Sequence, residues 1–182
     1  MAKLLDSRVA AWILAVVVVL SILLGCGRSL MGLRADAERT FFNGVQGDGI
    51  GIASDLTALS AAAYNLTTVA SRYLDGQDTR IQNVLTAWGD LTAAQEVGDK
   101  YRASQTLTRE VYRLSDALKH LPLSEEDENY RQSLLTEINS RNSTMSHDGY
   151  NAQAQAFNAA LGGFPANLLG PLLGVRPLEL FR

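Results

Sequence analysis

The sequence predicts an all-α protein, in which an N-terminal transmembrane helix precedes an elongated antiparallel bundle of three or four helices. Two observations lead to this prediction. The first is a run of 19 uncharged, mainly apolar residues from Val9 to Gly27. The second is the recurrence of apolar residues at spacings of three and four along most of the remaining chain, with no strand-like alternation.

The apolar run has three interpretations. At 1.5 Å per residue it is just long enough to cross a hydrocarbon core of about 30 Å, so a spanning anchor is preferred. It also fits a lipoprotein signal, with Cys26 as the lipidated N-terminus, or a cleaved secretory signal. We therefore predict a single-pass protein of the cell membrane with the bulk of the chain extracytoplasmic, although positive charges flank the run almost equally on both sides.

The segment 29–45 continues helically from the apolar run, with apolar residues at spacings of three and four. The glycine-rich sequence GDGIGIASDL then interrupts it, and Ser54 or Asp55 is the expected N-cap of the next helix. That helix has a heptad spacing of the kind found in coiled coils. Its register shifts by four residues after Gly76, which indicates either a stutter or a true break.

A further helix is predicted over residues 100–120. Its apolar stripe consists of Leu107, Val111, Leu114, Leu118 and Leu121. After a turn at Pro122, Ser124 is the expected N-cap of a last helix of roughly 35 residues, about 50 Å, because proline is absent until Pro165. Gly149 can soften this helix, and Gly162 and Gly163 end it.

The C-terminal region carries a distinctive pattern. Tyr150-Asn151 and Phe157-Asn158 are seven residues apart, so two helical turns place both aromatic rings on one face with the asparagines beside it. Gly-Gly-Phe-Pro follows and ends at Pro165. This ending resembles the closing signature of the LemA family of bacterial membrane-anchored helical proteins.

The resemblance covers roughly residues 50–182. It includes AAAYNLTTVASRYLDGQDTRIQNVLTAW at 61–88 and SEEDENYRQSLLTEINSRNS at 124–143, and it departs from the family at Tyr64, where a proline is common. The predicted organisation is an anchor or lipoprotein signal at 1–28, a juxtamembrane helix with a glycine-rich hinge at 29–53, a LemA-like bundle at 54–165 and an apolar tail at 166–182.

Charge and cysteine content restrict the partners. The first 28 residues carry a net charge of +2 and the remainder −5, with no basic stripe, so nucleic acid is excluded as a partner. Cys26 is the only cysteine, which rules out an intramolecular disulfide and leaves lipidation as its candidate chemistry. The expected partners are the membrane and a protein of the envelope, and a homo-oligomer is compatible with the sequence.

The sequence predicts no catalytic, cofactor or metal site. The glycine cluster lacks the strand and the Gly-Lys-Ser/Thr of a phosphate loop, so a linker or hinge is preferred. His120 and His147 have no second ligand at metal-binding spacing and are expected at the surface. The acidic run 125–128 is expected to be a solvated helix start favoured by the helix dipole.

The remaining candidates concern packing and interaction. Asparagines on helix faces are expected to form interhelical hydrogen bonds; they are Asn65, Asn139, Asn142, Asn151 and Asn158. The candidate residues for interaction or packing at the C-terminal signature are Tyr150, Asn151, Phe157, Asn158, Phe164 and Pro165. The apolar tail is expected to fold back on the bundle through a short helix that buries Leu168, Leu169, Leu172 and Leu173, or else to contact a membrane or a partner.

Two functions fit these features. The preferred one is a non-enzymatic, membrane-anchored helical scaffold or interaction protein of the bacterial cell envelope, as the LemA resemblance implies. The alternative is a lipoprotein-type ligand-binding or sensory module that is acylated at Cys26.

Overall fold

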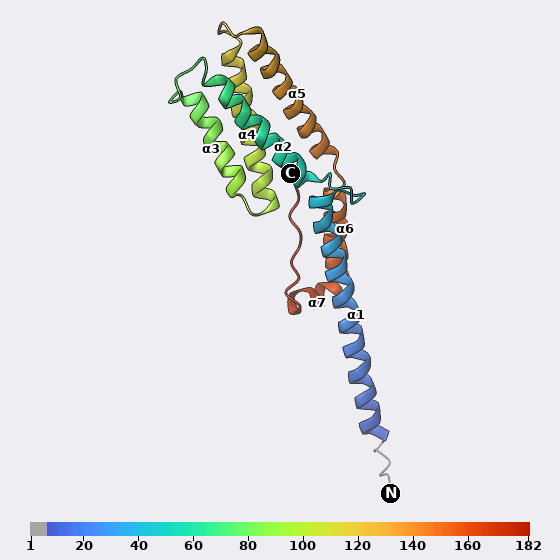
Figure 1. Ribbon diagram of the computed structural model, residues 1–182. Coiled ribbons are helices and arrows are strands. Elements are labelled where there is room, and N and C mark those ends of the chain that lie inside the picture. The colour runs from blue at the N-terminus through green and yellow to red at the C-terminus, as the bar shows by residue number, and fades with distance from the viewer. Residues whose placement is uncertain (1–6) are drawn as a thin grey trace. The chain divides into compact units, whose positions relative to one another are not determined.

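The computed structural model describes residues 7–182, and its regular structure in that range is entirely helical, which confirms the all-α prediction (Figure 1). The helices are α1 (Ser7–Asn43), α2 (Ile52–Ala70), α3 (Thr79–Ala93), α4 (Val97–Leu118), α5 (Glu125–His147), α6 (Tyr150–Gly162) and α7 (Ala166–Leu172). The chain forms two compact units. Among the described residues, one comprises residues 7–37 and 153–178, and the other comprises residues 38–152 and 179–182.

Helix α1 is one continuous helix of 37 residues. Within the described residues, it is the one helix whose length and apolar composition are sufficient to cross a membrane. Its large apolar side chains between Val9 and Leu24 are almost all exposed, whereas Leu30, Ala37 and Phe41 in its second half are buried. The predicted helical continuation beyond the apolar run is therefore confirmed.

The glycine-rich loop between α1 and α2 is a tight turn. A side chain on Gly44, whose φ is +72°, would lie 2.5 Å from the carbonyl oxygen of Ile50, and one on Gly51 would lie 2.6 Å from that of Phe41. Glycine is required at both positions because a Cβ has no room. The prediction that Ser54 or Asp55 caps α2 was wrong, since α2 begins at Ile52 directly after Gly51.

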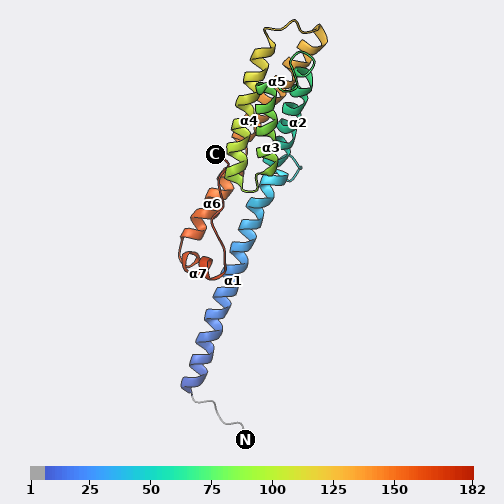
Figure 2. The ribbon, with the colours of Figure 1, turned by 90° about the vertical axis from the view of Figure 1, so that its left-hand side faces the viewer.

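Helices α2 to α5 form an antiparallel four-helix bundle in the second unit (Figures 1 and 2). The most extensive contacts join α2 to α5 and α3 to α4. The predicted apolar stripes form its core, whose fully buried members include Leu59, Ala63, Leu66, Val84, Leu107, Val111, Leu114, Leu118 and Ile138. Helix burial at these positions follows from the 3.6-residue period.

Two stretches of chain for which the sequence allowed or predicted one continuous helix are interrupted in the structure. Residues 71–78 form turns between α2 and α3, so the register shift near Gly76 is a true break. The last helix is not a single element, because Asp148 has an extended backbone and accepts a hydrogen bond from the Tyr150 amide at 2.7 Å, which starts α6. Gly149 has no room for a Cβ, which would lie 2.4 Å from Cγ2 of Val45.

The first unit contains the N-terminal part of α1, most of α6, α7 and the extended segment that follows α7. That segment runs along α1, where Arg34 Nη1 donates to the carbonyl of Arg176 at 2.7 Å. Leu173 lies against Gly27, at which an added Cβ would be 2.9 Å from Leu173 Cδ1. The C-terminal segment is thus held beside α1 from Gly27 to Arg34.

Candidate functional site

Two asparagines of α6 bind the backbone of the C-terminal tail. In the first unit, Asn158 Nδ2 donates to the carbonyl of Leu178 and Asn158 Oδ1 accepts from the Leu178 amide, both at 2.8 Å. In the second unit, Asn151 makes the same pair of bonds to the Phe181 carbonyl and amide, at 2.9 and 2.8 Å. A primary amide carries one acceptor and two donors, so each side chain pairs with a residue's backbone as a neighbouring strand would.

The end of the tail also contacts the bundle. Tyr150 Oη donates to the carbonyl of Glu179 at 2.7 Å, and the Glu179 carboxylate accepts from the Gly98 amide in the first turn of α4 at 2.8 Å. A carboxylate at a helix N-terminus is favourable because it satisfies an unpaired amide and complements the helix dipole. The ring of Phe181 packs edge-on against Phe41 and Tyr101.

The C-terminal signature residues divide into buried and exposed groups. Tyr150 and Phe157 are buried, as their shared face predicts, whereas Phe164 is 84% exposed. Pro165 follows a cis peptide bond and is the N-cap residue of α7. Asn151 and Asn158 hydrogen-bond the tail backbone, so the prediction that they join helices was wrong.

The tail folds back, as preferred from the sequence, but with a different set of side chains. Of the four leucines expected to be buried, only Leu169 is buried, while Leu168 and Leu172 are 60% and 81% exposed. The buried tail residues beyond α7 are Val175, Leu178 and Phe181. The prediction for α7 was therefore wrong for most of its leucines, since α7 buries Leu169 on one face only and the extended segment supplies the other buried apolar side chains.

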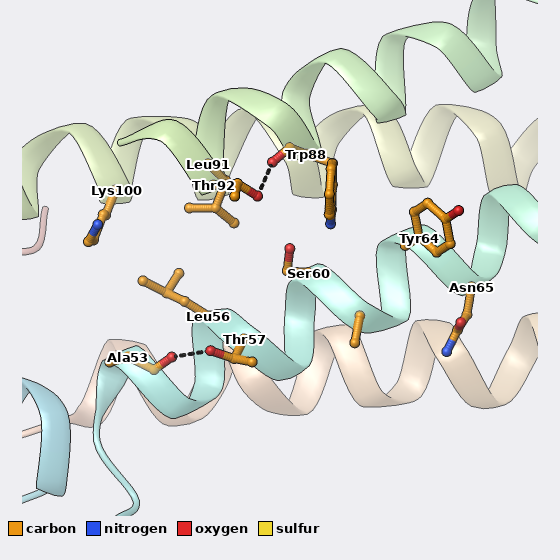
Figure 3. A pocket seen from close by; sticks show the side chains of 11 residues that line it. Ala53, Leu56, Thr57, Ser60, Tyr64, Asn65, Trp88, Leu91, Thr92 and Lys100 are labelled. Atoms are coloured by element: carbon orange, nitrogen blue, oxygen red, sulfur yellow. Dashed lines mark hydrogen bonds between the residues drawn. The ribbon is translucent and has the colours of Figure 1, made fainter. Parts of the chain in front are cut away.

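An open groove of about 580 Å³ lies between α2 and α3 in the second unit (Figure 3). Helix α2 contributes Ala53, Leu56, Thr57, Ser60, Ala61, Tyr64 and Asn65; α3 contributes Trp88, Leu91 and Thr92; α4 contributes Lys100. Small side chains on α2 create the hollow. Tyr64 and Trp88, whose ring centroids are 5.7 Å apart, lie toward one end, and Lys100 lies at the other.

The groove lining is mainly apolar in character. The hydroxyls of Thr57 and Thr92 donate to carbonyls of their own helices at 2.9 Å. Because these hydroxyls already have a hydrogen-bond acceptor, the two threonines can present their methyl groups to the groove without leaving a donor unpaired. The other polar side chains of the lining are those of Ser60, Tyr64, Asn65, Trp88 and Lys100. An apolar trough with a few polar groups at its ends suits a helix or a compact apolar ligand.

The other predicted residues are distributed over the molecule. Asn139 and Asn142 of α5 bond to Tyr112 and Thr108 of α4, which confirms the interhelical prediction for these two. Asn65 lines the groove instead. Cys26 is a free, half-buried thiol within α1.

Both histidines are exposed, as the sequence predicts. Across residues 7–182, no group of three or more His, Cys, Asp or Glu side chains is arranged to hold a metal ion. In the glycine-rich loop, Asp48 Oδ1 accepts from the Ile50 amide at 3.0 Å and so closes the turn.

The acidic start of α5 is more than a solvated helix end. Ser124 caps it, as predicted, by accepting from the Asp127 amide. Asp127 is buried, and donation from Tyr73 Oη, together with Ser124 and Arg72, holds the pKa of its carboxyl below the ordinary value. Hydrogen bonds from Arg131 and Gln132 lower the pKa of Glu128 to about 2.

A second ionic group lies where α2 begins and α5 ends. Asp55 is buried and accepts from Arg141 Nη1 at 3.1 Å. Burial raises the pKa of Asp148, and the charge of Asp55 adds to this effect. Sequence reasoning missed this group because its members are far apart along the chain.

Sequence reasoning also missed the groove and the capping role of Glu179. A signal for the cap was present, because Glu179 is the single acidic residue in a mainly apolar tail. No family model, no curated protein and no solved structure matches this chain.

Proposed function

We propose that this chain is a non-enzymatic, LemA-like scaffold or interaction protein of the bacterial cell envelope, which the first part of α1 anchors in the membrane. The observation that carries this proposal is the exposure of the apolar part of α1. Its exposed large apolar side chains from Val9 to Leu24 are each between 45% and 75% accessible.

Free energy supports a lipid environment for this segment. Burying one such side chain is worth about 1.5 to 3 kcal/mol, so eleven of them represent on the order of 20 kcal/mol that is recovered in a bilayer and not in water. The run lacks charged residues from Val9 to Gly27, and Arg8 and Arg28 flank it. This pattern is typical of a single spanning helix.

The groove between α2 and α3 supports the interaction part of the proposal. It is open, mainly apolar and bounded by two aromatic side chains, which are frequent anchors in protein interfaces. An amphipathic helix of a second envelope protein is the expected occupant, with an acidic side chain near Lys100 and apolar side chains against Ala61 and Leu91.

Site-specific photocrosslinking in the membranes of cells that produce the full chain tests this role. A photoreactive residue at Ser60, inside the groove, should give a discrete covalent adduct with another protein. The same residue at Ser133, which is exposed on α5, is the matched control and should give none. In the Ser60 background, Thr57→Trp should fill the groove and abolish the adduct. Equal adducts at both positions, or an adduct insensitive to Thr57→Trp, would contradict a groove-directed interaction.

The lipoprotein alternative is favoured by the position of Cys26 at the end of the apolar run and by a groove large enough for a small ligand. Intact mass spectrometry of the protein from its native membrane separates the two. A mass that includes the residues before Cys26 supports the spanning anchor. Loss of those residues together with added acyl mass on Cys26 supports the lipoprotein module.

A further inference from the structure

Helix α7 and Phe164 just before it expose an apolar face that nothing in their own unit covers. Phe164, Leu168 and Leu172 are 84%, 60% and 81% exposed. Leu168 and Leu172 are four residues apart, so they lie on one face of the helix. The other side of α7 is packed within the same unit, where Ala166, Leu169 and Gly170 are buried.

Contacts within the first unit fix α7 beside the end of the apolar run of α1. Leu173, directly after α7, lies against Gly27, which is the last uncharged residue before Arg28. The chain then passes along α1 to Arg34, which donates to the Arg176 carbonyl. Seven residues of α1 separate these two contacts, about 10 Å along the helix, so α7 lies at the apolar end of this path.

The charge of this unit complements an anionic surface. On the α7 side of the apolar run, residues 28–37 and 153–178 contain three arginines and a single acidic residue, Asp36. Residues 38–152 and 179–182 contain 11 basic and 17 acidic residues, a net charge of −6. A net positive charge and exposed apolar side chains thus occur in the same unit, which is the combination found in helices that bind anionic lipid surfaces.

We propose that α7 is a membrane-interface element, which inserts Phe164, Leu168 and Leu172 into the headgroup region of an anionic bilayer next to the point where α1 leaves the hydrocarbon. The inference rests on the proposed membrane anchoring of α1. If α1 spans the bilayer, Gly27 lies at the hydrocarbon boundary, and the contact with Leu173 brings α7 to that depth. Interfacial helices bury their apolar face about 5 to 10 Å into the headgroup and acyl boundary, which matches a single layer of exposed side chains.

Depth-dependent fluorescence quenching tests this placement in the full chain. The chain carries Cys26→Ser and one new cysteine labelled with an environment-sensitive dye, at Leu172, at Val17 in the apolar run or at Ser133 on α5. It is reconstituted in vesicles of phosphatidylcholine and phosphatidylglycerol with bromine atoms either near the headgroups or near the bilayer centre. We expect Leu172 to lose emission mainly with shallow bromines and Val17 mainly with deep ones, while Ser133 keeps its emission with both.

The outcomes separate this inference from the proposed anchor. Quenching at Val17 without quenching at Leu172 overturns the interfacial role of α7 and leaves the anchor intact. If Leu172 is then also shielded from a water-soluble quencher, a protein or a second copy of the chain covers α7. Quenching at Leu172 without quenching at Val17 overturns the spanning anchor but supports lipid contact by α7. No quenching at either position overturns both.

A pair of variants that add negative charge to different sides of α7 provides a second measurement. With the dye at Phe164, the double substitution Leu168→Asp and Leu172→Asp should abolish shallow quenching, because it places carboxylates on the lipid-facing side. Asn167→Asp puts a negative charge on another, exposed side of α7 and should retain the quenching. All the substituted positions are exposed, so far-ultraviolet circular dichroism should be unchanged. Equal quenching in both variants would overturn the inference.

Discussion

Replacing Asn151 by aspartate tests whether its side chain holds the end of the tail on the bundle. The change keeps the shape of the side chain and the oxygen that accepts from the Phe181 amide. It removes the Nδ2 group that donates to the Phe181 carbonyl at 2.9 Å and sets a carboxylate oxygen against that carbonyl. Leaving a half-buried acceptor without its partner costs about 1 to 3 kcal/mol.

The expected readout is the exchange rate of the Phe181 amide hydrogen, measured by hydrogen–deuterium exchange of the full chain in detergent. A loss of about 2 kcal/mol in the free energy of tail opening corresponds to roughly thirtyfold faster exchange. Asn139→Asp is the matched control. Asn139 is exposed and accepts from Tyr112 Oη, and an aspartate oxygen can accept the same bond.

The defect should also depend on pH with a definite sign. In the folded state the new carboxyl faces the Phe181 carbonyl, and only its protonated form can donate a hydrogen bond to that carbonyl. The folded-state pKa of the carboxyl is therefore raised above its unfolded value of about 3.9. The folded variant then binds more protons than the unfolded one between these two pKa values, so its deficit relative to the wild type grows as pH rises through them and shrinks below both. Wild-type exchange in the Asn151→Asp variant at neutral pH would refute this account of the tail.

Three further outcomes follow from the packing and the charges. Leu114→Asp should lower the free energy of unfolding in urea by about 4 kcal/mol, because Leu114 is fully buried. Lys119→Asp, on the exposed side of the same helix end, should change it by less than about 1 kcal/mol. Equal unfolding midpoints for the two variants would show that the core lies on another face of α4. Glu179→Gln should speed exchange of the Gly98 amide a few-fold, since a neutral amide caps α4 more weakly by about 0.5 to 1 kcal/mol. The pKa of the Glu128 carboxyl is lowered from 4.5 to about 2, so this group contributes stability above pH 4.5 that is lost as pH falls toward 2. In Glu128→Gln, the melting temperature should therefore fall less between pH 4.5 and 2 than it does in the wild type.

The buried faces of the helices and the cap of α5 were predictable from sequence because they depend on residue spacing within one helix. The stripe from Leu107 to Leu118 is buried at every position, and Ser124 caps α5 as its acidic first turn indicates. A helical period specifies which side chains share a face. This relation is the same whichever helix packs against that face.

Features that depend on distant partners were not predictable in this way. Asn151 and Asn158 carry the right functional groups, but their partners are 30 and 20 residues away in a segment without regular structure. The periodicity of α7 defines two faces and cannot tell which one is covered. The split between α5 and α6 occurs where the side chain of Val45 lies against Gly149, a contact across about a hundred residues.

The asparagine contacts have a consequence for aggregation. An extended segment usually needs a sheet, and the edge of a sheet exposes a row of unpaired amides and carbonyls that can recruit a strand of another molecule. Here the pairing groups of Leu178 and Phe181 are met by side chains fixed on a helix. The extended tail therefore gains strand-type backbone pairing from side chains of a helix, without any neighbouring strand whose own outer edge would remain open.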